Sequence, residues 1–148
     1  MLELESEFLC ELKAGLETPA HIIGQRVIIY VTGGTVQGPE INGEILPGGG
    51  DWITFRPDGT GILDVRALIR TDDGELIYIY YRGIQVIPPK LRAELQTGAT
   101  VDPSEYYFRT TPVFETSSEK YSWLTRIICV GVGAMEPGGV RYRLYQIL

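Results

Sequence analysis

The sequence predicts an all-β protein that forms a single closed or nearly closed antiparallel β-barrel of about eight to ten strands, with one short helix or loop as a cap. Two observations support this fold class. The 18 Gly and 9 Pro among the 148 residues fall at short intervals between runs rich in Ile, Val, Thr, Tyr and Trp, which is typical of short strands. Two Asp-Gly turns, Pro57–Gly59 and Asp72–Gly74, join such runs and indicate hairpins, so the sheet is expected to be antiparallel.

The bounds of the individual elements follow from the same Gly and Pro residues between the strand-like runs. We expect strands at residues 2–11, 26–33, 36–46, 51–56, 61–71, 75–83, 106–114, 124–133 and 140–148. Residues 88–97 are the one stretch with helical character, because Pro suits a first helical turn and Leu91 and Leu95 are four residues apart. We expect this short helix to cover one end of the barrel.

Length and charge bound the organisation and the partners. A chain of 148 residues is long enough to bury a real core, so we expect one domain over residues 1–148. The formal net charge is -6, and the lysines Lys13, Lys90 and Lys120 lie far apart. Because a nucleic-acid partner requires clustered positive charge, we expect none.

Cysteine and histidine usage gives no sign of a metal or redox centre. Cys10 and Cys129 have no neighbouring Cys or His at a ligand spacing, so buried thiols are expected, with a disulfide between the first and last strands as the alternative. His21 is the only histidine and falls in an expected loop. The run Gly48–Gly50 lacks the residues of a nucleotide-binding loop. We therefore expect no cofactor and no metal.

Nothing in the chain resembles a membrane or export segment. Glutamates interrupt any basic-then-apolar pattern near the start, and no apolar run reaches the roughly 18 residues that span a bilayer. We expect a cytoplasmic protein that does not bind membranes. Residues 26–31 and 124–130 are apolar on both strand faces, which makes a homo-oligomer plausible.

The run from Pro47 to Gly74 carries ionisable residues within strand-like segments. Side chains alternate along a strand, so Asp64, Arg66 and Arg70 share one face of residues 61–71, opposite an apolar face. This charged face either lies in water or lines a polar lumen. The nine Tyr against four Phe favour a half-polar cavity for an aromatic or polycyclic small molecule, although strand propensity alone also explains them.

Several motifs together resemble an uncharacterised family. PGGGDW at residues 47–52, LDVR and RTDDGELIYIYYRG across residues 63–83, and YYFRTTPVFET, KYSWL and VGVG in the second half are similar to the domain of unknown function 3237, also called UPF0311. The resemblance implies a small antiparallel β-barrel. The family pattern usually has Asn after Trp-Leu, where this chain has Thr125. The matching positions are Gly49, Gly50, Asp51, Trp52, Asp64, Arg66, Tyr78, Tyr81, Gly83, Tyr107, Phe108, Arg109, Phe114, Glu115, Thr116, Tyr121, Trp123 and Leu124.

Two functions fit these residues. The first is a cofactor-independent lyase, isomerase or cyclase that uses acid-base catalysis in the barrel cavity. The second is a binder or carrier of a hydrophobic or aromatic ligand. In a third interpretation the charged residues only form ion pairs that hold the barrel closed.

Each candidate residue has an expected role in the enzyme hypothesis. Bases, oxyanion-stabilising arginines and proton-donating tyrosines make up the catalytic set, which is Asp51 or Asp64, Arg66 and Arg109, and Tyr78 or Tyr107. Walls and ligand contacts make up the substrate-binding set, which is Trp52, Glu115, Tyr121, Trp123 and Thr125.

Overall fold

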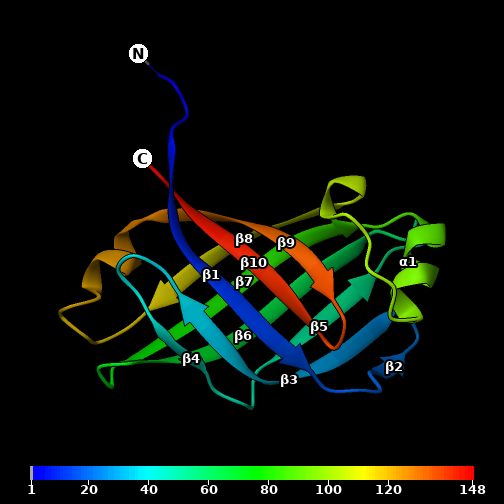
Figure 1. Ribbon diagram of the computed structural model, residues 1–148, viewed down its shortest axis with the longest axis horizontal. Helices are drawn as coiled ribbons and strands as arrows, with labels where there is room; N and C mark the ends of the chain where they lie inside the picture. The colour runs from blue at the N-terminus through cyan, green and yellow to red at the C-terminus, as the bar shows by residue number, and fades with distance from the viewer. Residues whose placement is uncertain (1) are drawn as a thin grey trace.

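The computed structural model describes residues 2–148, in which ten strands form one antiparallel sheet that closes into a barrel (Figure 1). The closed barrel has eight strand positions, because β4 and β5 both lie between β3 and β6, and β2 pairs only with β3 outside it. The strands are β1 Ser6–Leu16, β2 His21–Ile23, β3 Arg26–Gln37, β4 Gly43–Ile45, β5 Gly50–Phe55, β6 Gly61–Thr71, β7 Leu76–Val86, β8 Tyr107–Glu115, β9 Ile128–Glu136 and β10 Gly139–Ile147.

Closure depends on the first strand, which pairs with β10 along one edge and with β3 along the other. The two Asp-Gly turns join β5 to β6 and β6 to β7 as hairpins, as predicted, and β9 and β10 form a third hairpin. Strands β7 and β8 are also antiparallel neighbours, but the long segment that contains α1 connects them. The predicted fold class, a closed antiparallel barrel with one short helix, is confirmed.

Four local predictions need correction. Residues 124–126, predicted as the start of a strand, belong to the 3-10 helix Ser122–Arg126, and β9 begins only at Ile128. The residues predicted as two strands around Gly33–Gly34 form one continuous strand, β3, up to Gln37. Strand β1 begins at Ser6, later than predicted, and residues 2–5 stand away from the barrel (Figure 1). His21 lies on the short strand β2, not in a loop, with its ring 5.5 Å from that of Tyr30.

Period-two alternation sorts the side chains into an inner and an outer set. The interior holds a continuous apolar core, and both cysteines are buried free thiols within it. The most completely buried members of the core are Cys10, Val36, Ile41, Leu63, Ile69, Ile77, Ile79, Phe108, Leu124, Cys129 and Leu144. Burying such side chains is the main force that stabilises the barrel.

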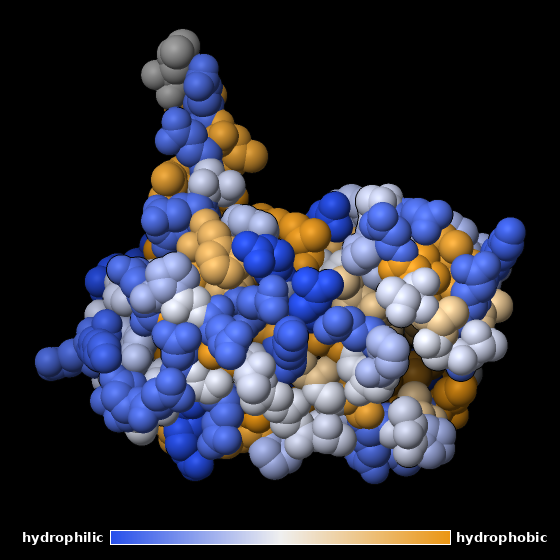
Figure 2. Space-filling view, viewed as in Figure 1, coloured by the Kyte–Doolittle hydropathy of each residue, from blue (hydrophilic) through white to orange (hydrophobic). Residues whose placement is uncertain are grey.

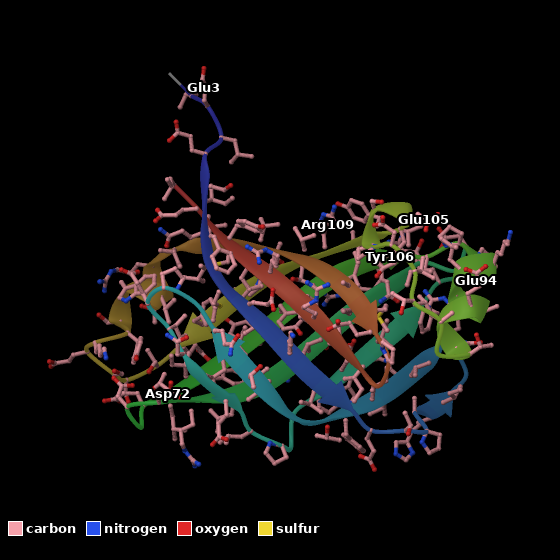
Figure 3. All side chains as sticks on the ribbon, in the orientation of Figure 1. Glu3, Asp72, Glu94, Glu105, Tyr106 and Arg109 are labelled. Atoms are coloured by element: carbon pink, nitrogen blue, oxygen red, sulfur yellow. The ribbon has the colours of Figure 1, made fainter. Side chains whose placement is uncertain are left out.

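The two ends of the barrel are closed differently. At one end, Asp73 in the β6–β7 turn accepts hydrogen bonds from the Thr71 and Tyr121 hydroxyls and from the Lys120 ammonium. At the other end lies the helix α1, Pro89–Gln96, which has no fully buried residue. Asp72 and Glu94, labelled in Figure 3, mark these opposite ends. The helix therefore covers the barrel mouth loosely, whereas polar bonds tie the opposite end.

A close contact between β8 and β9 limits side-chain size inside the barrel. The Phe108 ring is 1% exposed and packs edge-on against Tyr142, with ring centroids 5.3 Å apart. It also lies over Gly133, where an added Cβ would sit only 2.7 Å from the nearest ring atom. A glycine is therefore needed at position 133 so that the Phe108 ring can occupy its place in the core.

We expect Gly133→Ala to lower the free energy of unfolding by about 1–3 kcal/mol, because the new methyl group overpacks the Phe108 ring. Urea unfolding of Gly133→Ala, Phe108→Leu and the double variant measures the effect and its origin. The smaller Leu side chain makes room for the methyl group, so the double variant should be more stable than the sum of the two single losses predicts. Strict additivity would contradict the contact as the cause.

Candidate functional site

A cavity of about 100 Å³ lies inside the barrel toward the α1 end. Figure 2 shows a recess with apolar, orange atoms beside the helix on this side of the molecule. Its walls come from eight strands and α1, and most of its lining is aliphatic or aromatic. The lining residues are Ala14, Leu16, Ile29, Val31, Asp51, Ile53, Phe55, Leu63, Val65, Tyr81, Gln85, Arg92, Phe108, Met135, Val140 and Tyr142.

Asp51 is the one carboxylate among these lining residues. It points inward because it shares the inner face of β5 with Ile53 and Phe55. The β5–β6 ladder pairs Asp51 with Val65 and resumes three residues later along β5, and within this gap the Asp64 backbone amide donates to Asp51 Oδ1 at 3.1 Å. The carboxylate thus satisfies a strand amide, which fixes its position in the wall of the cavity.

The surroundings favour the neutral form of this carboxyl group. Burial raises the pKa of Asp51 from 3.8 to about 7, and the Asp64 carboxylate adds to the rise, while the hydrogen bond from the Asp64 amide opposes it. A pKa near 7 means that both the acid and the carboxylate are well populated at neutral pH. Such a group is suited to proton transfer.

Two tyrosines face Asp51 from other strands. Tyr81 on β7 and Tyr142 on β10 are 7% and 3% exposed, and their rings meet edge-on with centroids 5.3 Å apart. Burial raises the pKa of both phenols, and the charge of Asp51 contributes to each rise, so the three groups lie close together. Because their pKa values are high, both phenols stay protonated and serve as hydrogen-bond donors.

The mouth of the cavity carries the remaining polar groups. The Arg92 guanidinium on α1 donates to Gln85 Oε1 at 3.2 Å and lies over the Phe55 ring, 5.0 Å from its centroid. The Gln85 side-chain amide in turn contacts Met135 Sδ at 3.5 Å. The cavity therefore has an apolar body, one ionisable carboxyl group with two phenols inside, and a cationic rim.

The structure brings only Asp51 of the predicted catalytic set into this cavity. The other members project from the outer faces of β6, β7 and β8, because they alternate with inward residues such as Val65, Ile79 and Phe108. These outward residues are Asp64, Arg66, Tyr78, Tyr107 and Arg109.

Four of the outward residues contact one another or main-chain atoms, and the fifth, Tyr78, packs its ring 5.4 Å from that of Tyr80. Arg66 Nη2 lies 3.7 Å from Asp64 Oδ1, and both side chains are well exposed. Arg109, labelled in Figure 3, stacks over Tyr107 at 5.1 Å and donates to the Phe108 carbonyl oxygen. The charged face of β6 thus lies in water, which is the first of the two alternatives for this face, and does not line the lumen.

The predicted substrate-binding residues also lie away from the cavity. Trp52 is on the outer face of β5, and Glu115 is exposed at the end of β8. Tyr121 donates its hydroxyl proton to Asp73 at the opposite end of the barrel, where Trp123 packs against the core. Thr125 is exposed, and its hydroxyl donates to the Ser122 carbonyl oxygen at 2.7 Å, so the family departure at this position does not alter the cavity.

Four polar residues of the cavity were not among the predicted site residues, namely Tyr81, Gln85, Arg92 and Tyr142. The sequence could have indicated Tyr81 and Gln85. Both are an even number of residues from Ile77 and Ile79 along β7, so they lie on the same, inward face of that strand. For Arg92 there is no such signal, since only the folded chain brings α1 against the barrel mouth.

Across residues 2–148, no group of three or more His, Cys, Asp or Glu side chains is placed to hold a metal ion. In the same part of the chain, no helix has the length and apolar character needed to cross a membrane.

The raised pKa of Asp51 implies a pH-dependent cost to stability. Below its unfolded value near 3.8 the carboxyl group is neutral in both states, and as pH rises from about 4 to 7 only the unfolded state ionises freely, so the folded state is progressively penalised. We expect Asp51→Asn to raise the free energy of unfolding by about 3–4 kcal/mol at pH 8 and by less than about 1 kcal/mol at pH 4.

Urea unfolding at pH 4, 6 and 8 checks this expectation. Asp64→Asn is the matched control, because it makes the same chemical change on the water side of the barrel wall. A stabilisation by Asp51→Asn that is equal at all three pH values would contradict a buried, titrating carboxyl group.

Both the sequence and the fold of this chain are similar to those of known proteins. The family model described as "Protein of unknown function (DUF3237)" matches residues 2–147. A UPF0311 protein from Clostridium acetobutylicum is 43% identical over 126 residues, which cover 85% of this chain and 80% of the relative. The crystal structure of a conserved protein of unknown function from Rhodopseudomonas palustris has a TM-score of 0.94 and 34% identity, covering 100% of this chain and 99% of the other.

A more distant relative has a named activity. The hydroalkoxylation enzyme phnH from Penicillium herquei is 30% identical over 133 residues, which cover 86% of this chain and 72% of the relative. The crystal structure of an enzyme from the same fungus has a TM-score of 0.71 and 28% identity, covering 100% of this chain and 97% of the other. On the family match and these identities, the chain belongs to the DUF3237 (UPF0311) family of β-barrel proteins.

Proposed function

We propose that this protein is a cofactor-independent isomerase or cyclase that adds a hydroxyl group across a carbon–carbon double bond inside the barrel cavity. The observation that carries the proposal is the Asp51 carboxyl group, with a pKa of about 7, in an apolar cavity beside the Tyr81 and Tyr142 phenols. The named activity of the Penicillium relative, hydroalkoxylation, is the same class of reaction. Such an addition needs proton transfer and exclusion of water, which this cavity is suited to provide.

The reaction balances with a single carboxyl group. Neutral Asp51 donates its proton to one alkene carbon, the π bond breaks, and the substrate oxygen forms a C–O bond to the other carbon. The hydroxyl proton of the substrate then returns to the Asp51 carboxylate. No electron leaves or enters the site, and the enzyme ends in its starting protonation state. Asp51 therefore acts first as an acid and then as a base.

The environment of Asp51 supports both halves of this cycle. Because burial raises its pKa, the neutral acid is well populated at neutral pH, whereas an exposed aspartate would be almost wholly ionised. The rings of Tyr81, Tyr142 and Phe108 surround the same space, and their faces stabilise positive charge that develops on the alkene. The phenol hydroxyls remain protonated and orient the substrate oxygen.

The size of the cavity limits the substrate. An apolar cavity of about 150 Å³ holds a benzene ring. The present cavity measures about 100 Å³ and opens toward α1, so we infer that one ring-sized part enters while the rest of the molecule lies in the mouth. This favours a monocyclic or narrow aromatic ligand over a fully enclosed polycycle.

The same cavity also suits a carrier, because an apolar body with a few polar groups is how small ligands are commonly held. A carrier binds the ligand without chemical change, so the two functions differ in whether product forms. The raised pKa of Asp51 favours the enzyme, since a carrier has no need for a carboxyl group that weakens the fold.

A minimal probe is 2-(2-methylallyl)phenol, in which one ring carries both the hydroxyl group and an alkene whose protonation gives a tertiary centre. We expect conversion to 2,2-dimethyl-2,3-dihydrobenzofuran, followed by chromatography, and a rate that falls about tenfold per pH unit above pH 7 as Asp51 ionises. Asp51→Asn should lower the rate at least about 100-fold, because it removes the proton donor.

Asp64→Asn is the control and should retain most of the wild-type rate, although the rate should fall at a slightly lower pH because the Asp64 carboxylate contributes to the raised pKa of Asp51. Ligand-observed NMR on the same samples separates the alternatives. Binding without product supports the carrier, and the absence of both binding and product rejects a ring-sized substrate. A rate that persists in Asp51→Asn rejects Asp51 as the acid.

A further inference from the structure

Arg92 has an unusual position for a charged side chain in this protein. It comes from the first half of α1, yet its guanidinium lines the same cavity as Asp51. The aliphatic and aromatic lining removes part of its hydration, and this burial lowers the pKa of Arg92. Holding a cation in such a place is costly unless another group compensates the charge.

The protein itself supplies little compensation. Arg92 makes one side-chain hydrogen bond, to the neutral Gln85 Oε1, and it stacks on the Phe55 ring. Within residues 2–148, no carboxylate oxygen lies within 4.0 Å of its guanidinium nitrogens. A guanidinium has five N–H donors, so most of those of Arg92 have no acceptor in the protein.

Among the described residues that line the cavity, Arg92 is the one arginine. Within residues 2–148, five of the nine other arginines also have no carboxylate partner within 4.0 Å, but none of them lines the cavity; these are Arg26, Arg56, Arg82, Arg109 and Arg126. Four arginines pair with carboxylates on the outer face of the barrel, and these are Arg66, Arg70, Arg141 and Arg143. Acidic residues are abundant, with 19 Asp and Glu against 13 Lys and Arg, yet none is placed beside Arg92. The remaining N–H donors of Arg92 thus lie at the cavity mouth, and no carboxylate in the described part of the chain balances the positive charge of the guanidinium.

We infer that the ligand of this cavity carries a carboxylate, and that Arg92 binds this group at the mouth while the reacting part of the molecule lies beside Asp51. The inference rests on the cavity of the proposed function and names its substrate class as unsaturated or aromatic carboxylic acids. The planar fork of a guanidinium matches the two oxygens of a carboxylate, and bonds of this kind are among the strongest polar contacts in proteins.

The separation of Arg92 from Asp51 is part of this arrangement. The groups that shift the pKa of Asp51 are its burial and the amide and carboxylate of Asp64, and Arg92 is not one of them. An arginine in direct contact would keep Asp51 ionised and prevent it from donating a proton. With Arg92 at the mouth, its charge remains available to the ligand.

A carboxylate ligand must be attracted locally, because the protein as a whole is negatively charged. The net charge of -6 repels anionic ligands at long range, and ionised Asp51 adds to this repulsion above pH 7. A single well-placed cation overcomes this repulsion at short range only, so binding should select for a carboxylate that reaches Arg92.

Benzoate and benzamide provide a matched pair of probes, because they have the same ring and nearly the same shape but differ in charge. Titration by calorimetry or NMR at pH 6 gives their dissociation constants with the wild type, Arg92→Met, Arg92→Lys and Arg109→Met. We expect the wild type to prefer benzoate, and Arg92→Met to bind benzoate about 10- to 100-fold more weakly while its affinity for benzamide stays unchanged.

The variants are chosen to separate charge from packing. Methionine keeps an unbranched apolar side chain over Phe55, and lysine keeps the charge but loses the planar fork, so Arg92→Lys should show an intermediate affinity. Arg109→Met is the control, because Arg109 also stacks on an aromatic ring and donates to a main-chain oxygen, but outside the barrel. It should bind benzoate as the wild type does.

Equal affinity of Arg92→Met and wild type for benzoate would overturn the inference, as would equal binding of benzoate and benzamide by the wild type. Thermal unfolding confirms that each variant is folded before titration. Failure here is distinct from failure of the proposed reaction: binding of benzoate that depends on Arg92, with no turnover of the phenol probe, keeps the anion site and rejects only the chemistry. In Asp51→Asn, the loss caused by Arg92→Met should persist.

Discussion

The pairing of β1 with both β10 and β3 is the constraint on which the rest of the structure depends. It closes the sheet, so that each strand of the barrel has one face in a dry interior and one in water. Alternation along each strand then has a fixed meaning. The same closure that buries Ile69, Ile77 and Leu144 also carries Asp51, Tyr81 and Tyr142 into one cavity, although they come from three separate strands.

The interior serves two opposing needs. Apolar burial stabilises the barrel, but it makes a carboxyl group at position 51 costly to ionise, and only the Asp64 amide offsets this cost. The two ends of the barrel are also held by different interactions. Polar bonds around Asp73 fasten one end, while α1 rests on the other through partly buried Leu91 and Leu95. The side-chain hydrogen bonds around Asp73 thus lie at the end away from the cavity, and the loosely packed helix lies at the end beside it.

Much of the fold was predictable because it depends on local chemistry. The Asp-Gly turns set two hairpins, and Pro89 with Leu91 and Leu95 marked the helix. The error at Gly33–Gly34 has a tertiary cause. These glycines do not break β3, because they let β1 approach so closely that a Cβ at Gly34 would overlap the Lys13 carbonyl oxygen. A glycine pair that permits close strand packing looks the same in sequence as a turn.

The sequence by itself determined the strand content, the antiparallel hairpins and the two faces of β6, because turn residues and period-two alternation are local properties. It also contained Asp51 as a candidate base, whereas its proposed role as an acid follows from its burial in the folded barrel. Only the tertiary structure decided which face lies inside. The alternation of side chains predicts that Asp64 and Arg66 lie on the same face of β6. Whether that face points to water or into the cavity is decided only when β1 pairs with β3 and the barrel closes. The position of Arg92 was likewise decided by the packing of α1 against the barrel mouth. This packing brings Arg92 into the same cavity as Asp51 and Tyr142, although all three residues are far apart in the sequence.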